Sequence, residues 1–282
     1  IGFSSAFRNA GKIGADTISS GDTLSVAIWE NVDQGVLANA GAPTSLSDIT
    51  VDSAGYIFIP YAGRIRVAGD SVEEIRQKIT NLLAKQTPDP QVVVDRSAGD
   101  GSTVTMTGSI SAILPIERPT RTLITMLASA GGVKTSPEVT KIKVTRGSES
   151  SEIWYEDLIE NPEMDIALRH GDKIHVDRDT RKFMALGAAS QTVTKFESKT
   201  LSVLEALAQI GGLQSQTSDP SGIFVFRNEA AVISNLVLNR NDLVGPQRMV
   251  YVLDLTKPNG VFTARDFIVR DGDTIYITEA PY

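Results

Sequence analysis

The sequence predicts an α+β fold, in which short strands form small mixed sheets and each sheet is covered by one helix. Two observations predict it. A segment of roughly 80 residues occurs twice, with an apolar helical stripe between alternating strands in each copy. A different pattern of strands and one helix precedes the two copies. The composition agrees, since 41% hydrophobic residues is ordinary for a globular protein, and 282 residues allow two domains or three small ones.

The two copies of the repeat match strand by strand and helix by helix. Residues 104–108 and 183–187 are alternating strands that end at a glycine, and residues 122–133 and 202–213 follow in nearly the same register. Residues 122–133 and 202–213 both have apolar residues at positions i, i+3, i+4 and i+7. This spacing is typical of a short amphipathic helix, so one helix is predicted in each copy.

Both predicted helices have start and stop signals. Thr122 and Ser202 are the expected N-caps, and Glu205 completes a capping box with Ser202. A Gly-Gly pair then ends each helix, because glycine readily adopts the left-handed backbone found after a helix C-terminus. The apolar stripe places Leu207 in the core of the second copy.

Each copy closes with two further strands. Strands are predicted at 142–146 and 223–227, and a Gly-Asp turn precedes the last strand within 168–176 and 269–277. The order is therefore strand, helix, strand, turn, strand, which is a β-grasp-like plan. We expect the Gly-Asp steps to shape tight turns rather than to do chemistry. The second copy contains about 20 extra residues near 228–249, and we expect this insertion to contact a subunit or partner, because added loops often have a function.

Residues 16–98 form a separate predicted unit. A Gly-Asp step again precedes a strand, and the turn at 52–55 between two apolar strands predicts a hairpin. A helix begins at Ser71, and Glu74 completes its capping box. A Pro-rich segment ends this helix before another strand. The glycine-containing segment 97–102 is interpreted as the linker to the first repeat.

Charge and composition exclude several classes of function. There are 27 Lys and Arg against 34 Asp and Glu, so the net charge is −7, and the cations are not clustered. Nucleic acid is therefore not an expected partner, since binding a phosphate backbone needs clustered cations. The absence of Cys excludes disulfides, thiolate metal sites and Cys nucleophiles. The sequence has no nucleophile elbow, no phosphate-binding glycine motif and no apolar stretch of the ~18 residues that a membrane-spanning helix requires.

Few residues suggest chemistry. His170 and His175 are the only histidines, and their spacing places them on opposite faces of a strand, so no metal site is expected. A glycosidase-type carboxylate pair depends on separation in space and stays open. We assign no catalytic, cofactor-binding or metal-binding residue. The most conspicuous acidic pairs are interpreted as solvated surface: Glu73-Glu74 and Glu156-Asp157.

Aromatic and cationic side chains are the candidates for contact with a saccharide, because sugar rings stack on aromatic rings. Trp29 ends an alternating strand, so a packing role is favoured for it. Arg64 and Arg66 alternate with apolar residues along a strand. They either attract an acidic polymer or simply face water, and the solvent-facing interpretation is favoured. No polysaccharide-binding residue is assigned. The other aromatic candidates are Trp154, Tyr56, Tyr61 and Tyr155.

Taken in order, these motifs resemble the outer-membrane polysaccharide export (Wza-type) family. The resemblance covers residues 16–279. The motifs most specific to this family are the Gly-Asp strand at 20–29, the segment 51–63, the Val-Ala-Gly segment at 67–69 before the helix, and the strand at 90–94. The repeats resemble the soluble-ligand-binding β-grasp (SLBB) domains of that family. The implied domains are an export domain at 16–98, a first β-grasp repeat at 102–178, and a second at 181–279 with the insertion near 228–249.

The resemblance implies a non-catalytic subunit of a ring-shaped conduit that exports capsular or exopolysaccharide across the outer membrane, with its body in the periplasm. The implied partners are further copies of the chain, the polysaccharide, an inner-membrane polysaccharide co-polymerase or tyrosine kinase, and in some relatives a separate outer-membrane barrel. No cofactor is implied. A monomeric saccharide-binding or scaffold protein of the cell envelope is the alternative, and a carbohydrate-active enzyme is a third interpretation.

The sequence departs from the family pattern at both ends. There is no Cys near the start to attach a lipid. The sequence stops at Pro281-Tyr282, where many members continue into an amphipathic helix that spans the outer membrane. We therefore expect neither a lipid anchor nor a membrane-spanning helix in this chain. Truncation and natural absence both stay open as explanations.

Overall fold

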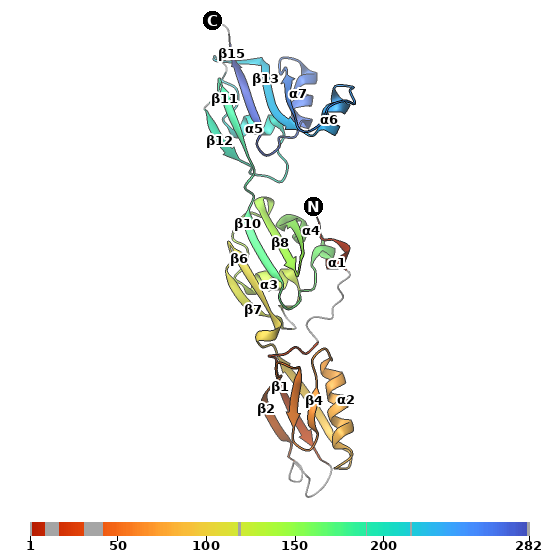
Figure 1. Cartoon of the computed structure of the whole chain (residues 1–282). Helices are drawn as coiled ribbons and strands as arrows, with labels where there is room; N and C mark the ends of the chain where they lie inside the picture. Colours follow the sequence, from red (N-terminus) through yellow and green to blue (C-terminus); the bar gives the residue numbers. More distant parts are fainter. Residues whose placement is uncertain are drawn as a thin grey trace. The chain divides into compact units, whose positions relative to one another are not determined.

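The computed structural model has the predicted α+β fold. The chain divides into two compact units, Ile1–Asp177 and Arg178–Tyr282. Within the described residues, two hydrophobic cores belong to the first unit and one belongs to the second, and each lies between strands and helices (Figure 1). Residue 16, Pro281 and Tyr282 lie outside the described residues, and the division into three domains stays a prediction. The residues described are 2–8, 17–30, 42–117, 120–189, 191–214 and 216–280.

The core built from residues 18–94 is covered by helix α2 (Val72–Leu83). Ile75, Ile79 and Leu83 of this helix are buried, as the apolar stripe predicts, and its capping box is present. The sheets on the other side are antiparallel. The larger sheet has the order β2 (Thr44–Thr50), β1 (Thr23–Trp29), β5 (Gln91–Ser97), and the smaller consists of β3 (Tyr56–Ile59) and β4 (Gly63–Arg66).

The hairpin predicted around 52–55 is wrong. The strands that flank this turn belong to different sheets, since β2 pairs with β1 and β3 pairs with β4. Asp52 still shapes the turn, because its Oδ1 accepts hydrogen bonds from the amides of Ala54 (2.9 Å) and Tyr56 (2.8 Å). Alternation of apolar residues fixes which side chains face the core but leaves the partner strand undetermined.

The segment 97–102 is packed more tightly than a linker. It contains the short helix η2 (Asp100–Ser102). A Cβ atom at Gly99 would lie 1.8 Å from the carbonyl oxygen of Gly21, and one at Gly101 would lie 1.5 Å from that of Ser20. Only glycine fits at these two positions, so the segment is held against the first Gly-Asp turn.

The two repeats have the same strand order. The first sheet reads β7-β6-β10-β8-β9 and the second β12-β11-β15-β13-β14. In each sheet the first strand of the repeat runs parallel to the last, β6 with β10 and β11 with β15, which fits the predicted β-grasp-like plan. The strands are β6 (Thr103–Gly108), β7 (Ala112–Pro115), β8 (Thr140–Arg146), β9 (Glu149–Trp154) and β10 (Lys173–Arg178), then β11 (Lys182–Gly187), β12 (Thr192–Lys195), β13 (Ser218–Glu229), β14 (Gln247–Leu253) and β15 (Thr274–Glu279).

The predicted order omits the edge strands of both sheets. These are β7 and β9 in the first repeat and β12 and β14 in the second. An edge strand pairs on one side only, and most positions of these four strands are exposed or half-buried. Periodicity therefore separates them poorly from loops.

Corresponding helices cover the two sheets, α3 (Leu123–Ser129) and α5 (Val203–Gln209). Their N-caps are Thr122 and Ser202, as predicted. The glycines that follow the helices have φ angles between 74° and 98°, the left-handed values expected where a helix ends.

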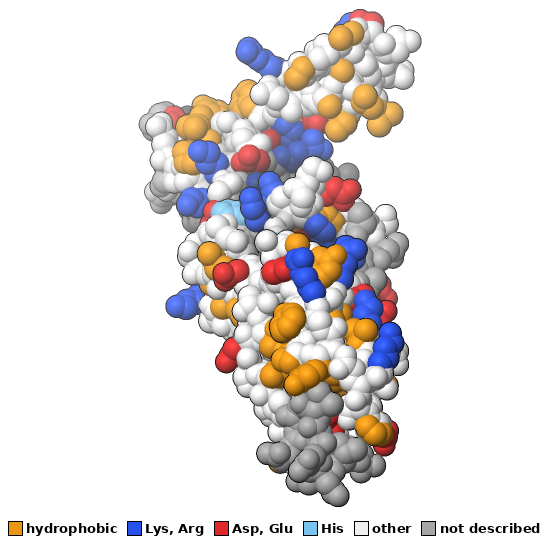
Figure 2. All heavy atoms as spheres, turned by 60° about the horizontal axis from the view of Figure 1, so that its bottom comes forward, with side chains coloured by type: hydrophobic (Ala, Val, Ile, Leu, Met, Phe, Trp, Pro, Cys, Tyr) orange, Lys and Arg blue, Asp and Glu red, His pale blue; other side chains and the backbone are white. Residues whose placement is uncertain are grey.

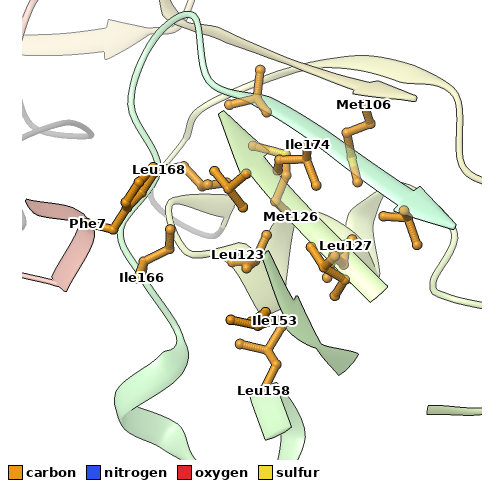
Figure 3. Packing of buried hydrophobic residues seen from close by; sticks show 14 of the residues in the cluster. Phe7, Met106, Leu123, Met126, Leu127, Ile153, Leu158, Ile166, Leu168 and Ile174 are labelled. Atoms are coloured by element: carbon orange, nitrogen blue, oxygen red, sulfur yellow. The ribbon is translucent and has the colours of Figure 1, made fainter. Parts of the chain in front are cut away.

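An N-terminal helix, α1 (Ser5–Arg8), completes the core of the first repeat. Phe3 and Phe7 are 1% and 2% exposed, and their ring centroids lie 5.6 Å apart. Figure 3 shows Phe7 in the same cluster as Leu168 and Ile166. A single apolar pair four residues apart, outside the predicted domains, gives no sequence signal for this packing.

Further helices lie in the connections between strands. In the first repeat, Gly147 and Ser148 alone join β8 to β9, whereas α6 lies between β13 and β14, near the predicted insertion. None of the described helices has both the length and the hydrophobicity needed to cross a membrane. The remaining helices are α4 (Tyr155–Glu160), α6 (Ala231–Val237), α7 (Pro258–Asp266), η4 (Pro137–Val139) and η5 (Pro162–Met164).

Leu207→Ala is expected to lower the free energy of unfolding by ~2–5 kcal/mol, because it leaves a cavity in a packed core. Leu207 is 2% exposed and belongs to the core of the second repeat. Urea denaturation followed by circular dichroism measures the change. Ile113→Ala is the control, since Ile113 is 69% exposed, and it should change stability by ~0.5 kcal/mol at most. A loss below ~1 kcal/mol for Leu207→Ala would contradict the core assignment.

Candidate functional site

In each of the three Gly-Asp steps that directly precede a strand, the Asp is paired with an arginine. The Asp side chains are at most 2% exposed, and each carboxylate also accepts the backbone amide three residues earlier at 2.8–2.9 Å. We call these pairs the Gly-Asp clamps. They are Asp22 with Arg96 (2.7 Å), Asp172 with Arg146 (2.7 Å) and Asp273 with Arg227 (2.6 Å).

In the repeats, the clamp also fixes the chain before the turn. Nη2 of Arg146 donates a hydrogen bond to the carbonyl of Ala167 (2.9 Å), and Nη2 of Arg227 donates one to the carbonyl of Ile268 (2.7 Å). The arginine thus joins one strand to the turn that precedes the last strand. This arrangement is structural, as the Gly-Asp pattern predicts.

The clamp arginines were not among the predicted site residues, although the sequence contains a signal for them. Each follows a buried valine by two residues at the end of a strand. A cation at the end of a buried strand needs a partner carboxylate, and the Gly-Asp steps provide one in each case. The three tripeptides are Val94-Asp95-Arg96, Val144-Thr145-Arg146 and Val225-Phe226-Arg227.

A cavity of about 340 Å³ lies beside the clamp of the second repeat. Its lining includes Arg227, Glu229, Tyr251, Phe267 and Arg270. Glu229 is 2% exposed. It accepts hydrogen bonds from the Tyr251 hydroxyl (3.1 Å) and from Nη1 of Arg270 (2.8 Å). The cavity therefore has a buried, fully engaged carboxylate at its wall and aromatic rings beside it.

Electrostatics keep Glu229 ionised. Burial by itself raises the pKa of Glu229, but the hydrogen bond from Tyr251 and the charges of Arg270 and Arg227 outweigh burial, so the pKa lies below its ordinary value. Burial and the neighbouring carboxylate raise the pKa of Tyr251. A glycosidase proton donor needs a raised carboxyl pKa. Glu229 is therefore poorly suited to donate a proton at neutral pH.

This network predicts acid-sensitive stability. Because the pKa of Glu229 is lowered by folding, its stabilising contribution is complete above about pH 5 and is lost as the pH falls further. We expect Glu229→Gln to be less stable than the unmodified chain at pH 7 and to lose stability less steeply between about pH 5 and pH 3. Urea denaturation of both proteins across this range measures the two slopes. Equal slopes would contradict the network.

The two histidines do not form a shared site. Nδ1 of His175 lies 3.0 Å from the Thr107 hydroxyl, and its Nε2 lies 3.9 Å from Asp177. His170 is exposed in the turn before β10. In the part of the chain that the structure describes, no group of three or more His, Asp and Glu side chains is arranged to hold a metal ion.

The packing role favoured for Trp29 is wrong. Its side chain is 37% exposed, on the face of β1 opposite the buried positions. Strand alternation gives the reason, since Leu24, Val26 and Ile28 point to the core and odd-numbered neighbours point away. Trp154 is buried instead, with Lys141 Nζ 4.9 Å from its ring centroid.

The tyrosine candidates have different surroundings. Tyr61 is 52% exposed and has a left-handed φ of 63°. Tyr56 lies beneath the Arg64 guanidinium, which is 4.2 Å from its ring centroid. Tyr155 packs against the core of the first repeat. These three rings are not assembled into one stacking surface by any contact among the described residues.

Arg64 and Arg66 both face solvent from β4, as favoured. Arg64 pairs with Asp52 at 2.8 Å. The hydrogen bond from the Tyr56 amide, followed by that from Arg64, lowers the pKa of Asp52. Figure 2 shows Lys and Arg side chains mixed with acidic and hydrophobic ones on the face in view.

The two acidic pairs, Glu73-Glu74 and Glu156-Asp157, have different surroundings. Glu74 caps α2, and the hydrogen bonds from Arg76 and Gln77 lower the pKa of the exposed Glu73 to about 2. These two side chains face solvent, as predicted. Glu156 is half-buried and lines a cavity of about 230 Å³ in the first repeat, so the prediction of a solvated position is wrong for it. Two other carboxylates line this cavity, those of Glu138 and Glu160.

Comparison with known proteins gives one consistent result. A family described as "Polysaccharide biosynthesis/export protein" matches residues 13–96. The chain is 32% identical over 270 residues to the Vi polysaccharide export protein VexA/TviF of Salmonella typhi, covering 94% of this chain and 74% of that protein. It is 29% identical over 298 residues to the capsule polysaccharide export protein BexD of Haemophilus influenzae, covering 99% and 75%. It is 27% identical over 279 residues to the EPS I polysaccharide export outer membrane protein EpsA of Ralstonia solanacearum, covering 92% and 70%.

Proposed function

The chain belongs to the polysaccharide biosynthesis/export protein family, and we propose that it is a subunit of a ring-shaped conduit through which a capsular or exopolysaccharide leaves the cell envelope. The observation that supports this most strongly is the 32% identity to the Vi polysaccharide export protein over 94% of the chain. The similarity extends over the first core and both repeats instead of one motif. The names of the relatives support a position at the outer membrane, and we place the body of the protein in the periplasm.

The proposed conduit has no catalytic step. A polymer that is held tightly at every sugar cannot move on, so a conduit acts through its shape and through weak polar contacts. The buried carboxylates support this, because they are already engaged. Asp22, Asp172 and Asp273 hold the Gly-Asp clamps, and Glu229 is bound by Tyr251 and Arg270.

The conduit requires copies of the chain that contact one another head to tail, because only such contacts close into a ring around a cavity. The polysaccharide passes through the ring. An inner-membrane polysaccharide co-polymerase or tyrosine kinase delivers it from the other side of the periplasm.

Deletion of the gene in its host tests the function. We expect polysaccharide to disappear from the cell surface while polymer of unchanged linkage and composition accumulates inside the envelope. Reintroduction of the wild-type gene should restore surface polymer. Surface antibody labelling and linkage analysis of total polysaccharide measure the two quantities. Undiminished surface polymer would contradict the conduit and favour a saccharide-binding module, and surface polymer of altered linkage or length would favour an enzyme.

A further inference from the structure

The outer face of the second repeat's sheet is hydrophobic on every strand. Six outward hydrophobic side chains here are 36–60% exposed, although residues of this kind are usually buried. We call this surface the apolar sheet face. It consists of Val193 on β12, Met184 on β11, Tyr276 on β15, Phe226 on β13, and Val250 and Val252 on β14.

The apolar sheet face extends over all five strands, with Thr274 of β15 lying between Met184 and Phe226. Met184 lies opposite Val193, and Phe226 lies opposite Val250. Phe224, which is half-buried, connects the two sides: its ring centroid lies 6.4 Å from that of Tyr276 and 6.5 Å from that of Phe226. The patch exposes on the order of 500 Å², which is near the upper end for a monomer that binds nothing there.

The first repeat shows that the fold does not require an apolar outer face. At the matching positions it has mostly polar residues, and these bind one another. The hydroxyls of Thr145 and Ser150 lie 3.2 Å apart, and Glu152 pairs with Lys141 at 3.3 Å. Ile113, which matches Val193, is the one apolar member among the matching positions described. The hydrophobic surface is therefore particular to the second repeat.

The second repeat also exposes an apolar helix. Val232 and Leu236, four residues apart on one side of α6, are 80% and 81% exposed, and Val237 and Val244 are 53% and 88% exposed. We call these four residues the α6 ridge. The first repeat has only Gly147 and Ser148 in the corresponding place. Both unusual surfaces thus occur in the same repeat.

One copy cannot cover its own apolar sheet face with its own α6 ridge. Ile233 of α6 lines the cavity together with Tyr251 of β14. Strand alternation directs Tyr251 to the side of the sheet opposite Val250 and Val252. The helix therefore packs on one side of the sheet, and the apolar sheet face lies on the other.

We propose that the α6 ridge of one copy packs on the apolar sheet face of the next copy, in a head-to-tail contact that repeats around the ring; this inference rests on the proposed function. Each surface exposes on the order of 500 Å² of mainly apolar area, so one contact buries about 1,000 Å², which is the size a specific interface needs. Each copy then has one free ridge and one free face until the ring closes.

Cross-linking tests the contact directly, because the chain contains no Cys. We expect the full-length double variant Leu236→Cys/Val252→Cys to form a ladder of disulfide-linked oligomers on mild oxidation, seen by non-reducing denaturing electrophoresis. Each single variant should give no ladder. The matched control is Leu236→Cys/Glu152→Cys, since Glu152 holds the position in the first repeat that Val252 holds in the second, and it should stay uncross-linked.

A charge variant tests the same contact by affinity. Val252→Lys is expected to weaken self-association about tenfold or more, measured by light scattering over a dilution series, because it buries an unpaired charge. Val252 is 60% exposed within one copy, so the unfolding midpoint should stay unchanged at a dilution where both proteins are monomeric. Glu152→Lys is the control and should leave self-association unchanged.

Each other outcome overturns the proposal in a distinguishable way. A dimer from Leu236→Cys or Val252→Cys alone would mean a two-fold contact. An oligomer of normal mass without cross-links would mean that the ring uses another face, and the proposed function would stand. A monomer at every concentration would contradict both. A monomer that binds phosphatidylglycerol vesicles, with binding lost in Val252→Lys, would mean that the face is covered by lipid.

Discussion

Asp273→Ala is expected to lower the free energy of unfolding of the second repeat by about 3–5 kcal/mol, because the buried Arg227 loses its closest carboxylate and keeps only Glu229, at 3.4 Å. Arg227 is 6% exposed at its side chain and donates two hydrogen bonds to Asp273, at 2.6 and 2.9 Å. The substitution also removes the acceptor for the Arg270 amide, which shapes the turn before β15. Urea denaturation of the full chain, followed by circular dichroism, measures the loss.

An exposed ion pair in the same unit is the matched control. Arg240 and Asp242 form a pair whose side chains are 51% and 60% exposed, so Asp242→Ala should cost less than ~1 kcal/mol. The double variant Arg227→Met/Asp273→Ala should recover part of the stability lost in Asp273→Ala, since it also removes the buried guanidinium that has lost its closest partner. Similar small losses for Asp273→Ala and Asp242→Ala would mean that the clamp does not hold the turn.

Phe7→Ala is expected to lower the free energy of unfolding of the first unit by about 3–5 kcal/mol. The Phe7 ring is 2% exposed, packs against Phe3 and lies 5.1 Å from the guanidinium carbon of Arg146. Its removal opens a cavity and uncovers the arginine of the first repeat's clamp. Thermal and urea denaturation of the full chain measure the effect.

Phe58→Ala provides the comparison for Phe7→Ala. Phe58 is 66% exposed on β3, so its removal should change stability by ~0.5 kcal/mol at most. If Phe7→Ala costs less than ~1 kcal/mol, the N-terminal helix does not belong to the core of the first repeat.

Local signals allowed much of the fold to be predicted. The capping boxes at Ser71 and Ser202 depend on side chains three residues apart, so the sequence alone contains them. The helical stripe of α5 predicts the burial of Leu207 in the same way. The internal repeat added long-range information, because two copies of one pattern imply the same arrangement twice, and the two strand orders agree.

The errors concern strand pairing, side-chain direction and contacts between distant segments. The turn at Asp52 is locally compatible with a hairpin, yet β2 pairs with the earlier strand β1, and β3 pairs with β4, the strand that follows it. Trp29 has the right residue type for a core, but its place in the alternation points it outward. The clamp between Arg227 and Asp273 joins residues 46 positions apart, so the sequence can indicate that Arg227 needs a carboxylate partner but not where along the chain that partner lies.

The candidate site was predicted less well than the fold. The Gly-Asp steps were correctly interpreted as structural, but their arginine partners and the cavity around Glu229 depend on which side chains folding brings together. The apolar sheet face is visible as alternation in β13 and β14, where Phe224, Phe226, Val250 and Val252 occupy outward positions. Its significance emerges only by comparison with the polar face of the first repeat.

The absolute mass of the purified chain under non-denaturing conditions tests the conduit most directly. Light scattering at several protein concentrations should give one discrete mass that is a multiple of the 30.3 kDa of a single chain and does not change on moderate dilution. A mass of 30.3 kDa at every concentration would contradict a ring-shaped conduit.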